Sequence, residues 1–162
     1  MSVLGVDPGT ATTGYGIVEE QGDRIVALNY GVVITPARWG LAQRLQEIYR
    51  QLRVLVDEWR PESAAVEELF FSKNARTALA VGHARGVVLL ALADAGVPVY
   101  EYKPAQVKEA ITGYGAAPKE QMQLMVQRLL GLAQIPSPDD AADALALAIC
   151  HVHSVRWRSL TE

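Results

Sequence analysis

Two different periods of apolar positions run along the chain, and together they predict five strands and five helices. Short apolar runs that end at turn residues, such as residues 2–6 before Asp7-Pro8-Gly9, are typical of buried strands. Longer segments whose apolar residues recur about every 3.6 positions, such as residues 41–59, are typical of amphipathic helices. The predicted strands are residues 2–6, 14–20, 24–34, 63–67 and 97–100, and the predicted helices are residues 41–59, 74–95, 104–111, 118–132 and 139–155.

The order of these elements indicates the fold class. The first three predicted strands follow one another, with a hairpin turn at Gln21-Gly22-Asp23, whereas the later strands alternate with helices. We therefore expect an α/β fold with a mixed five-stranded sheet and helices on both faces. The length of 162 residues fits one domain, and we see no repeat, low-complexity tract or linker, so we expect residues 1–162 to form a single domain.

The helix predicted at residues 74–95 has an unusual surface, because apolar residues surround it. A helix that is apolar on all faces is normally buried on all faces. Gly82 and Gly86 lie four residues apart on one side, and each glycine weakens a helix interior by roughly 1 kcal/mol. This pair indicates a close approach of another backbone, and in so small a domain we expect a second subunit to cover the far side.

Composition narrows the class of protein. Half of the residues are apolar and the mean hydropathy is +0.10, as in an ordinary water-soluble globular protein. The sequence has no run of 18 apolar residues and no signal peptide, so we expect no membrane partner. The single cysteine, Cys150, excludes an intramolecular disulfide and suits the reducing cytoplasm, where we expect the protein to act.

Charge is distributed unevenly along the chain. The net charge is −3, which by itself argues weakly against a nucleic-acid partner. Residues 73–119, however, hold six basic and three acidic side chains, whereas the rest of the chain holds nine basic and fifteen acidic ones. A basic surface beside an acidic site is what an enzyme acting on a phosphate backbone needs, although ordinary surface charge would give the same numbers.

Four carboxylates border apolar segments from which charge is normally excluded. Asp7 and Glu67 each close a predicted buried strand. Asp140 and Asp143 open the almost wholly apolar helix predicted at residues 139–155. A carboxylate is expensive to remove from water unless it is paired or binds a metal. We therefore predict that the fold gathers these four side chains around divalent cations.

The spacing and chemistry of these acids favour a hydrolytic metal centre. Asp140 and Asp143 are about one helical turn apart and therefore point the same way. Two metal ions about 3.5–4 Å apart can activate water and stabilise the leaving oxygen of a phosphodiester. Carboxylate oxygens suit Mg²⁺, with Mn²⁺ as a substitute. Singly, an Asp-Pro-Gly turn or an aspartate before a helix has a simpler structural explanation, and only their joint occurrence favours a metal.

With these motifs in place, the sequence resembles RuvC-type Holliday junction resolvases, which belong to the ribonuclease H-like nuclease superfamily. The resemblance covers nearly the whole chain. Its blocks, in order, are Gly5-Val6-Asp7-Pro8-Gly9, Thr13-Gly14-Tyr15-Gly16, Val66-Glu67, Lys73-Asn74-Ala75, Ala84-Arg85-Gly86, Gln106-Val107-Lys108 and Asp140-Ala141-Ala142-Asp143-Ala144-Leu145-Ala146. The resemblance implies a ribonuclease H-like fold and a homodimer that nicks two opposed strands of a four-way DNA junction by two-metal-ion hydrolysis. It also implies work in recombination and repair alongside the RuvA–RuvB branch-migration complex.

The resemblance further implies a role for each of the four acids. By position they match the family's acidic tetrad and would hold two Mg²⁺ ions per active site: Asp7, Glu67, Asp140 and Asp143. Glu68 follows Glu67, and Asp139 precedes Asp140, so either member of each pair could face the metals. The alternation of side chains along a strand favours Glu67 over Glu68.

Five further residues are expected to contact DNA. Phe70 resembles an aromatic residue that stacks on an unpaired base at the crossover. Lys108 and Lys119 match basic positions close to the scissile phosphate, although an ordinary surface charge would look the same. Lys73 and Arg76 begin the helix predicted at residues 74–95, an end that disfavours cations, so an anionic partner explains them.

Other functions remain open at the level of the sequence. The element Asp7-Pro8-Gly9-Thr10 also occurs in actin-like ATP-binding folds, but these need two lobes, for which 162 residues leave no room. A ribonuclease H-like nuclease for another nucleic acid, such as a structured RNA precursor, would carry the same acids. A non-catalytic junction-binding module would keep the basic surface and would have no need for the acids.

Overall fold

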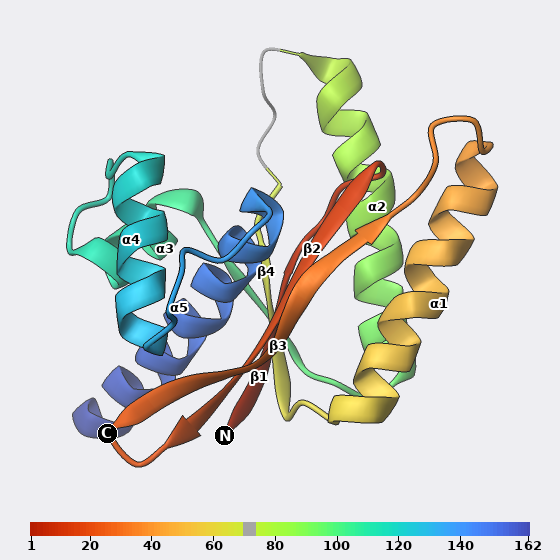
Figure 1. The fold of residues 1–162 in the computed structure, drawn as a ribbon. Coiled ribbons are helices and arrows are strands. Elements are labelled where there is room, and N and C mark those ends of the chain that lie inside the picture. Colours follow the sequence, from red (N-terminus) through yellow and green to blue (C-terminus); the bar gives the residue numbers. More distant parts are fainter. Residues whose placement is uncertain (70–73) are drawn as a thin grey trace.

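Figure 1 shows the fold in a computed structural model that describes residues 1–69 and 74–162. Five strands form one sheet in the order β3-β2-β1-β4-β5. The elements are β1 (Ser2–Asp7), β2 (Thr12–Gln21), β3 (Arg24–Ile34), α1 (Leu41–Trp59), β4 (Ser63–Glu67), α2 (Ala75–Asp94), β5 (Val99–Tyr102), α3 (Pro104–Thr112), α4 (Lys119–Leu130) and α5 (Asp139–Thr161). β1, β2 and β3 are antiparallel, whereas β1, β4 and β5 are parallel, so the predicted mixed five-stranded sheet is confirmed.

The helices cover both faces of the sheet and enclose two hydrophobic cores (Figure 1). On one face, α1 and α2 pack against the sheet around Leu4, Ile17 and Ile48, which are fully buried. On the other face, α3, α4 and α5 pack around Val3 and Val18. Because side chains alternate along a strand, β1 and β2 each supply both cores with neighbouring residues.

The last strand begins two residues later than predicted. The backbone N–H of Val97 donates a hydrogen bond to the carbonyl oxygen of Leu92 at 3.0 Å, so Val97 is bonded to the last turn of α2, which ends at Asp94. Pairing with β4 starts where the backbone N–H of Ala64 donates a hydrogen bond to the carbonyl oxygen of Pro98 at 2.8 Å and Val99 lies opposite Ala64. The apolar character of residue 97 therefore reflects its packing beneath α2 and not a place in the sheet.

The last helix continues to Thr161, six residues beyond its predicted end. Arg156 forms an ion pair with Glu20 of β2 and donates a hydrogen bond to the carbonyl oxygen of Gly22 at 3.1 Å. These contacts fasten the additional turns to the β2–β3 hairpin. A partner more than a hundred residues away in the chain thus extends a helix whose local sequence has already become polar.

α5 lies close to the sheet because the residues beneath it are glycines. A Cβ atom at Gly5 would lie 1.9 Å from the carbonyl oxygen of Ala144, and one at Gly14 would lie 2.0 Å from that of Asp140. A Cβ atom at Gly16 would lie 2.7 Å from a leucine side chain of the same helix. No side chain fits at these distances, so only glycine allows α5 to take this position.

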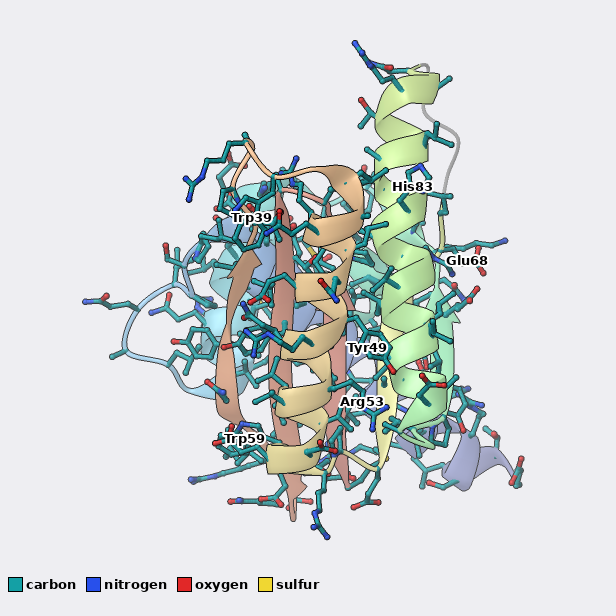
Figure 2. The ribbon with its side chains drawn as sticks, turned by 90° about the vertical axis from the view of Figure 1, so that its right-hand side faces the viewer. Trp39, Tyr49, Arg53, Trp59, Glu68 and His83 are labelled. Atoms are coloured by element: carbon teal, nitrogen blue, oxygen red, sulfur yellow. The ribbon has the colours of Figure 1, made fainter. Side chains whose placement is uncertain are left out.

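α2 packs against the rest of the molecule with one face. Figure 2 looks onto α1 and α2, which run side by side with Tyr49 and Arg53 between them. The apolar composition of α2 predicted burial on all faces. Within one chain this is not the case, because Leu79 and Leu90 are 65% and 54% exposed. By length and composition α2 could cross a membrane, which is weak evidence in a single helix, and less than a third of that stretch is buried.

The glycines of α2 are not explained by tight packing within the described residues. A Cβ atom at Gly82 would make an ordinary contact of 3.6 Å with Leu69, and one at Gly86 would have no described atom within 4 Å. The expected close backbone approach at Gly86 therefore does not occur inside the described part of the chain. Its open side is the surface on which an external partner would lie.

We expect Gly5→Ala to lower the free energy of unfolding by about 1–3 kcal/mol, because the new methyl group forces α5 away from β1. In a chain of this size, each kcal/mol corresponds to a fall in Tm of about 2–4 °C. Gly115→Ala is the matched control, since a Cβ atom there would meet only an ordinary contact of 3.6 Å. Urea denaturation measures both variants, and unchanged stability of Gly5→Ala would contradict the close packing of α5.

Candidate active site

The ends of β1 and β4 present two of the predicted acids on one face of the sheet. The strands are parallel neighbours with Val6 opposite Val66, so Asp7 and Glu67 reach the same edge of the sheet. Val6 and Val66 belong to the core under α1 and α2. Because side chains alternate along a strand, Asp7 and Glu67 face the opposite side, toward α5.

The first turns of α5 supply two further carboxylates. Asp140 and Asp143 are three positions apart and lie on one face of the helix. Ligand oxygens of Asp7, Asp140 and Asp143 lie within 4.8 Å of one another. The backbone of Asp140 passes directly over Gly14, and Gly14 is the residue opposite Asp7 in the sheet. The close packing of α5 therefore brings the carboxylates of α5 to the carboxylate of β1.

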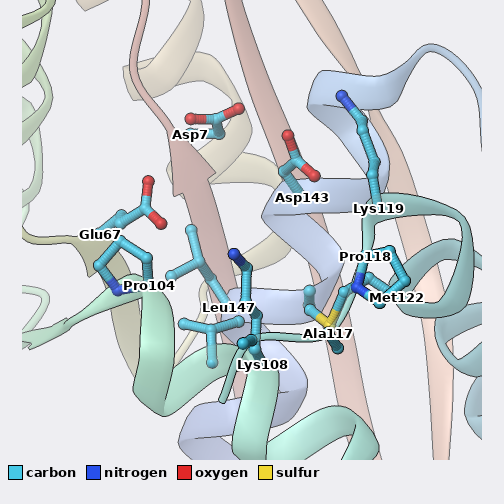
Figure 3. Close-up of a pocket in the computed structure, with 13 residues that line it drawn as sticks. Asp7, Glu67, Pro104, Lys108, Ala117, Pro118, Lys119, Met122, Asp143 and Leu147 are labelled. Carbon is cyan, nitrogen blue, oxygen red and sulfur yellow. The ribbon is translucent and has the colours of Figure 1, made fainter. Parts of the chain in front are cut away.

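A cleft of about 510 Å³ opens beside these acids (Figure 3). Asp7, Glu67 and Asp143 line this cleft. The tight acidic group consists of Asp7, Asp140 and Asp143, and Glu67 lies outside it. Lys108 of α3 and Lys119 of α4 line the same cleft. In Figure 3, the amino group of Lys108 points toward the space between Glu67 and Asp143. The cleft thus combines acidic groups with two positive charges.

Burial and mutual repulsion disfavour the charged forms of these carboxyl groups. Burial, followed by the charges of three acidic neighbours, raises the pKa of Asp7 to about 8. The pKa values of Glu67 and Asp143 are also raised, in each case mainly by burial. A lysine opposes each of these two shifts, Lys108 for Glu67 and Lys119 for Asp143. The two lysines therefore do not neutralise the cluster.

The donor set fits a hard divalent cation. Asp7, Asp140 and Asp143 offer carboxylate oxygens close together, and Glu67 offers another pair of oxygens on the same cleft. Magnesium, manganese and calcium prefer such oxygen ligands. A bound cation would also supply positive charge to these clustered carboxylates.

The sequence did not decide whether Asp139 and Glu68 could replace Asp140 and Glu67 as metal ligands, and the structure gives both of them other surroundings. Asp139 pairs with the amino group of Lys119 at 2.9 Å and is exposed. Glu68 lies beside a second, smaller cavity, although Glu67 borders that cavity as well. The structure therefore brings Asp140, and not Asp139, into the tight acidic group, and it places Glu67, and not Glu68, on the main cleft.

The other predicted DNA contacts lie outside this cleft or outside the described residues. Arg76 is exposed in the first turn of α2, where its backbone N–H donates to the side chain of Asn74 at 3.1 Å. It does not line the acidic cleft. Phe70 and Lys73 fall in the segment that the structure does not describe, so their roles stay predictions.

Two contributions to the site were not foreseen from the sequence. Pro104 and Met122 also line the cleft, and only the tertiary packing of α3 and α4 places them there. The role of Gly14 beneath Asp140 was also missed. The sequence did contain a sign of this role, because a glycine inside a strand weakens the strand and often marks a close backbone approach.

We expect the stability of the metal-free protein to fall as the pH rises from about 4 to about 8. In this interval folded Asp7, with a pKa of about 8, keeps a proton that the unfolded chain has released, since the ordinary pKa is 3.8. When the folded state binds more protons, the free energy of unfolding decreases with increasing pH. Asp7→Asn should flatten this decrease and raise stability at pH 8, as measured by urea denaturation with a chelator present.

Asp139→Asn is the matched control for this measurement. The pKa of Asp139 is lowered, chiefly by its hydrogen bond with Lys119, so its titration affects stability only at acidic pH. The control should therefore follow the wild-type curve between pH 5 and 8. If Asp7→Asn shows the same dependence of stability on pH as the wild type, Asp7 is not the group whose pKa is raised.

Comparison with known proteins gives close relatives over the whole chain. Residues 3–151 match the family model described as crossover junction endodeoxyribonuclease RuvC. The protein of that name from Syntrophomonas wolfei is 55% identical over 162 residues, which are 100% of this chain and 94% of the relative. The one from Chloroflexus aggregans is 57% identical over 154 residues, which are 95% of this chain and 94% of the relative.

Solved structures agree with this relationship. Thermus thermophilus RuvC in complex with a Holliday junction substrate superimposes with a TM-score of 0.93 at 42% identity, covering 98% of this chain and 96% of that one. The yeast mitochondrial Holliday junction resolvase shares the fold, with a TM-score of 0.63 at 16% identity, covering 98% and 83%. The predicted ribonuclease H-like α/β fold is therefore confirmed. By sequence, fold and the acidic cleft, this chain belongs to the RuvC family of crossover junction endodeoxyribonucleases.

Proposed function

We propose that this chain is an endonuclease that resolves Holliday junctions in DNA recombination and repair by paired symmetric nicks. One observation carries the proposal: the grouped carboxylates of Asp7, Asp140 and Asp143 lie at a cleft that Lys108 and Lys119 also line. Such acids can hold hydrolytic metal ions, and lysines can bind the phosphate groups of a DNA strand. The substrate is supported by the relatives, which are named crossover junction endodeoxyribonucleases, and by the Thermus protein solved with a junction substrate.

The cofactor in this proposal is Mg²⁺, two ions per active site, with Mn²⁺ as a substitute. The ligands are the four carboxylates predicted from the sequence: Asp7, Glu67, Asp140 and Asp143. When bound, such ions lower the pKa of a water molecule and neutralise developing charge on the leaving oxygen of a phosphodiester. The all-oxygen donor set and the raised pKa of Asp7 support a divalent cation here.

The protein's own lysines bind and orient the strand to be cut. Lys108 projects between Glu67 and Asp143, where its amino group would contact an oxygen of the scissile phosphate. Lys119 is held by Asp139 at 2.9 Å, in an ion pair that is more than half exposed on both sides. Exposed ion pairs of this kind are weak, so a DNA phosphate can replace Asp139 as the partner of Lys119.

Three further residues would contact DNA in this proposal. Arg76 is exposed in the first turn of α2 and carries positive charge toward solvent. Lys73, three residues earlier, would add a second phosphate contact, and Phe70 would stack on an unpaired base at the crossover. Stacking of this kind contributes about 1–3 kcal/mol per base and depends little on the base.

The working form in this proposal is a homodimer with one nuclease domain, residues 1–162, in each subunit. A four-way junction presents two equivalent strands, and a two-fold symmetric protein supplies two equivalent sites. The interface we assign is the open face of α2, where Leu79, Gly86 and Leu90 form an exposed stripe one or two turns apart. The dimer would act in the cytoplasm together with the RuvA–RuvB branch-migration complex.

The experiment that tests this function compares three labelled nucleic acids. A synthetic four-way junction, a linear DNA duplex and an RNA–DNA hybrid are each incubated with the protein, with and without Mg²⁺ or Mn²⁺. We expect metal-dependent paired nicks in the junction alone. Cleavage of the hybrid instead would indicate a nuclease for RNA, and tight junction binding with no cleavage in either metal would indicate a binding module.

Each tetrad substitution should abolish cleavage while junction binding survives. The variants are Asp7→Asn, Glu67→Gln, Asp140→Asn and Asp143→Asn. Each removes one ligand charge from the cluster and leaves the basic surface intact, so cleavage should fall by at least about 100-fold. The matched controls are Glu68→Gln and Asp139→Asn, which change adjacent acids outside the tight group and should keep junction cleavage. Full activity of a tetrad variant, or parallel loss of binding, would refute that ligand assignment.

Gly86→Leu should separate the two subunits without unfolding either one. No described atom lies within 4 Å of a Cβ atom at Gly86, so the monomer has room for the side chain, whereas helices packed at that point do not. Gln46→Leu, which adds a leucine to an exposed position of α1, is the matched control. Sedimentation at micromolar concentration should give a dimer for wild type and control and a monomer for Gly86→Leu. A monomeric wild type would refute the dimer, and a dimeric variant would move its interface elsewhere.

A further inference from the structure

Arg85 of α2 contacts the active-site strand from behind the acidic cleft. Its Nε donates a hydrogen bond to the backbone carbonyl oxygen of Glu67 at 3.2 Å, and its guanidinium pairs with Glu101 of β5 at 2.8 Å. The Arg85 side chain is only 16% exposed. A half-buried arginine with these two partners is held in one position, because the planar guanidinium binds a carbonyl and a carboxylate at once.

The contact falls at the last residue of β4. β4 ends at Glu67, and the backbone N–H of Glu68 still donates a hydrogen bond to the carbonyl oxygen of Tyr102 of β5 at 2.8 Å. Arg85 joins the last residue of β4 to Glu101, which lies opposite Val66 on β5. It therefore fixes the backbone of Glu67 from the α2 side, while the Glu67 side chain faces α5 on the other side.

The ion pair with Glu101 determines how Arg85 acts on Glu67. An unpaired guanidinium next to the cleft would compete with a metal ion for the Glu67 carboxylate. Glu101 holds the positive charge on the β5 side and leaves the Nε–H for the carbonyl oxygen of Glu67. The arrangement thus supports the backbone of Glu67 and leaves its carboxylate directed into the cleft.

A second contact joins α2 to the turn that follows the other acid-bearing strand, β1. The hydroxyl group of Thr10, three residues after Asp7, donates a hydrogen bond to the carbonyl oxygen of Ala80 at 2.8 Å. α2 is therefore bonded to the turn after β1 through Ala80 and to the end of β4 through Arg85. The same helix carries the open stripe assigned above to the second subunit.

We propose that Arg85 is a positioning residue for cleavage: it holds Glu67 in place for metal binding and ties that acid to α2. This role rests on the proposed nuclease function, and it assigns no contact between Arg85 and DNA. Displacing an active-site group by about 1 Å can lower a rate by about 100-fold. Loss of Arg85 should therefore weaken metal binding and slow cleavage while leaving junction affinity unchanged.

The test uses Arg85→Gln, Arg85→Lys and Glu101→Gln in the full-length protein, with Arg50→Gln as the matched control. Arg50 also pairs with a glutamate, Glu47, but lies exposed on α1. Calorimetric titration with Mn²⁺ gives metal affinity without DNA, single-turnover cleavage gives the rate at each Mn²⁺ concentration, and thermal denaturation monitors folding.

For Arg85→Gln we expect about 10-fold weaker Mn²⁺ binding and about 100-fold slower cleavage that high Mn²⁺ partly restores. Junction affinity and its salt dependence should stay within about two-fold of wild type. Arg85→Lys should not restore the rate, because an ammonium group lacks the planar fork that reaches both partners. Glu101→Gln should show a smaller effect of the same kind, and Arg50→Gln should match wild type.

Several results would overturn this role. Wild-type Mn²⁺ affinity and rate in Arg85→Gln would show that Glu67 needs no support. Weaker junction binding with a smaller salt slope would make Arg85 a phosphate contact instead. If Arg85→Gln does not fold, Arg85→Lys and Glu101→Gln test the role instead. Wild-type Mn²⁺ affinity and wild-type cleavage rates in both variants would refute it. A wild type that cleaves no junction defeats the proposed function, whereas calorimetry still tests the positioning of Glu67 by itself.

Discussion

The contact between the backbone of α5 and the glycines of the sheet determines where the acids meet. A side chain at Gly14 would push α5 outward at Asp140, whose carbonyl oxygen lies 2.0 Å from the Cβ position. Because Gly14 is the residue opposite Asp7 in the sheet, that displacement would separate Asp140 from Asp7. The grouping of carboxylates from distant segments within 4.8 Å thus depends on the absence of a side chain on the neighbouring strand.

The same grouping makes the metal-free site unfavourable. Burial and neighbouring charges raise the pKa of Asp7 to about 8, and Glu67 and Asp143 shift in the same direction. A cation that binds only the folded state would relieve this repulsion and stabilise the protein by mass action. Until a metal binds, the clustered carboxylates that catalysis needs therefore lower the stability of the fold. Contacts away from the cluster must then hold the strand ends in place.

The sequence predicted the parts of this site that depend on local pattern. Short apolar runs located β1 and β4, and the position of Asp7 and Glu67 at their ends follows from the same runs. Contacts between distant segments were not predictable, because period and propensity carry no information about them. The pairing of Lys119 with Asp139 and the extension of α5 by Arg156 are of this kind. Arg85 stood in one of the blocks of the family resemblance, but its contacts with Glu67 and Glu101 could not be predicted from the sequence.

The central claim is that these carboxylates bind divalent cations, and anomalous diffraction from Mn²⁺-loaded crystals tests it most directly. The account predicts anomalous density about 2 Å from carboxylate oxygens of Asp7, Asp140 and Asp143, and its loss in crystals of Asp7→Asn. Density at Asp139 or Glu68 instead, or none at the cluster at saturating Mn²⁺, would contradict it.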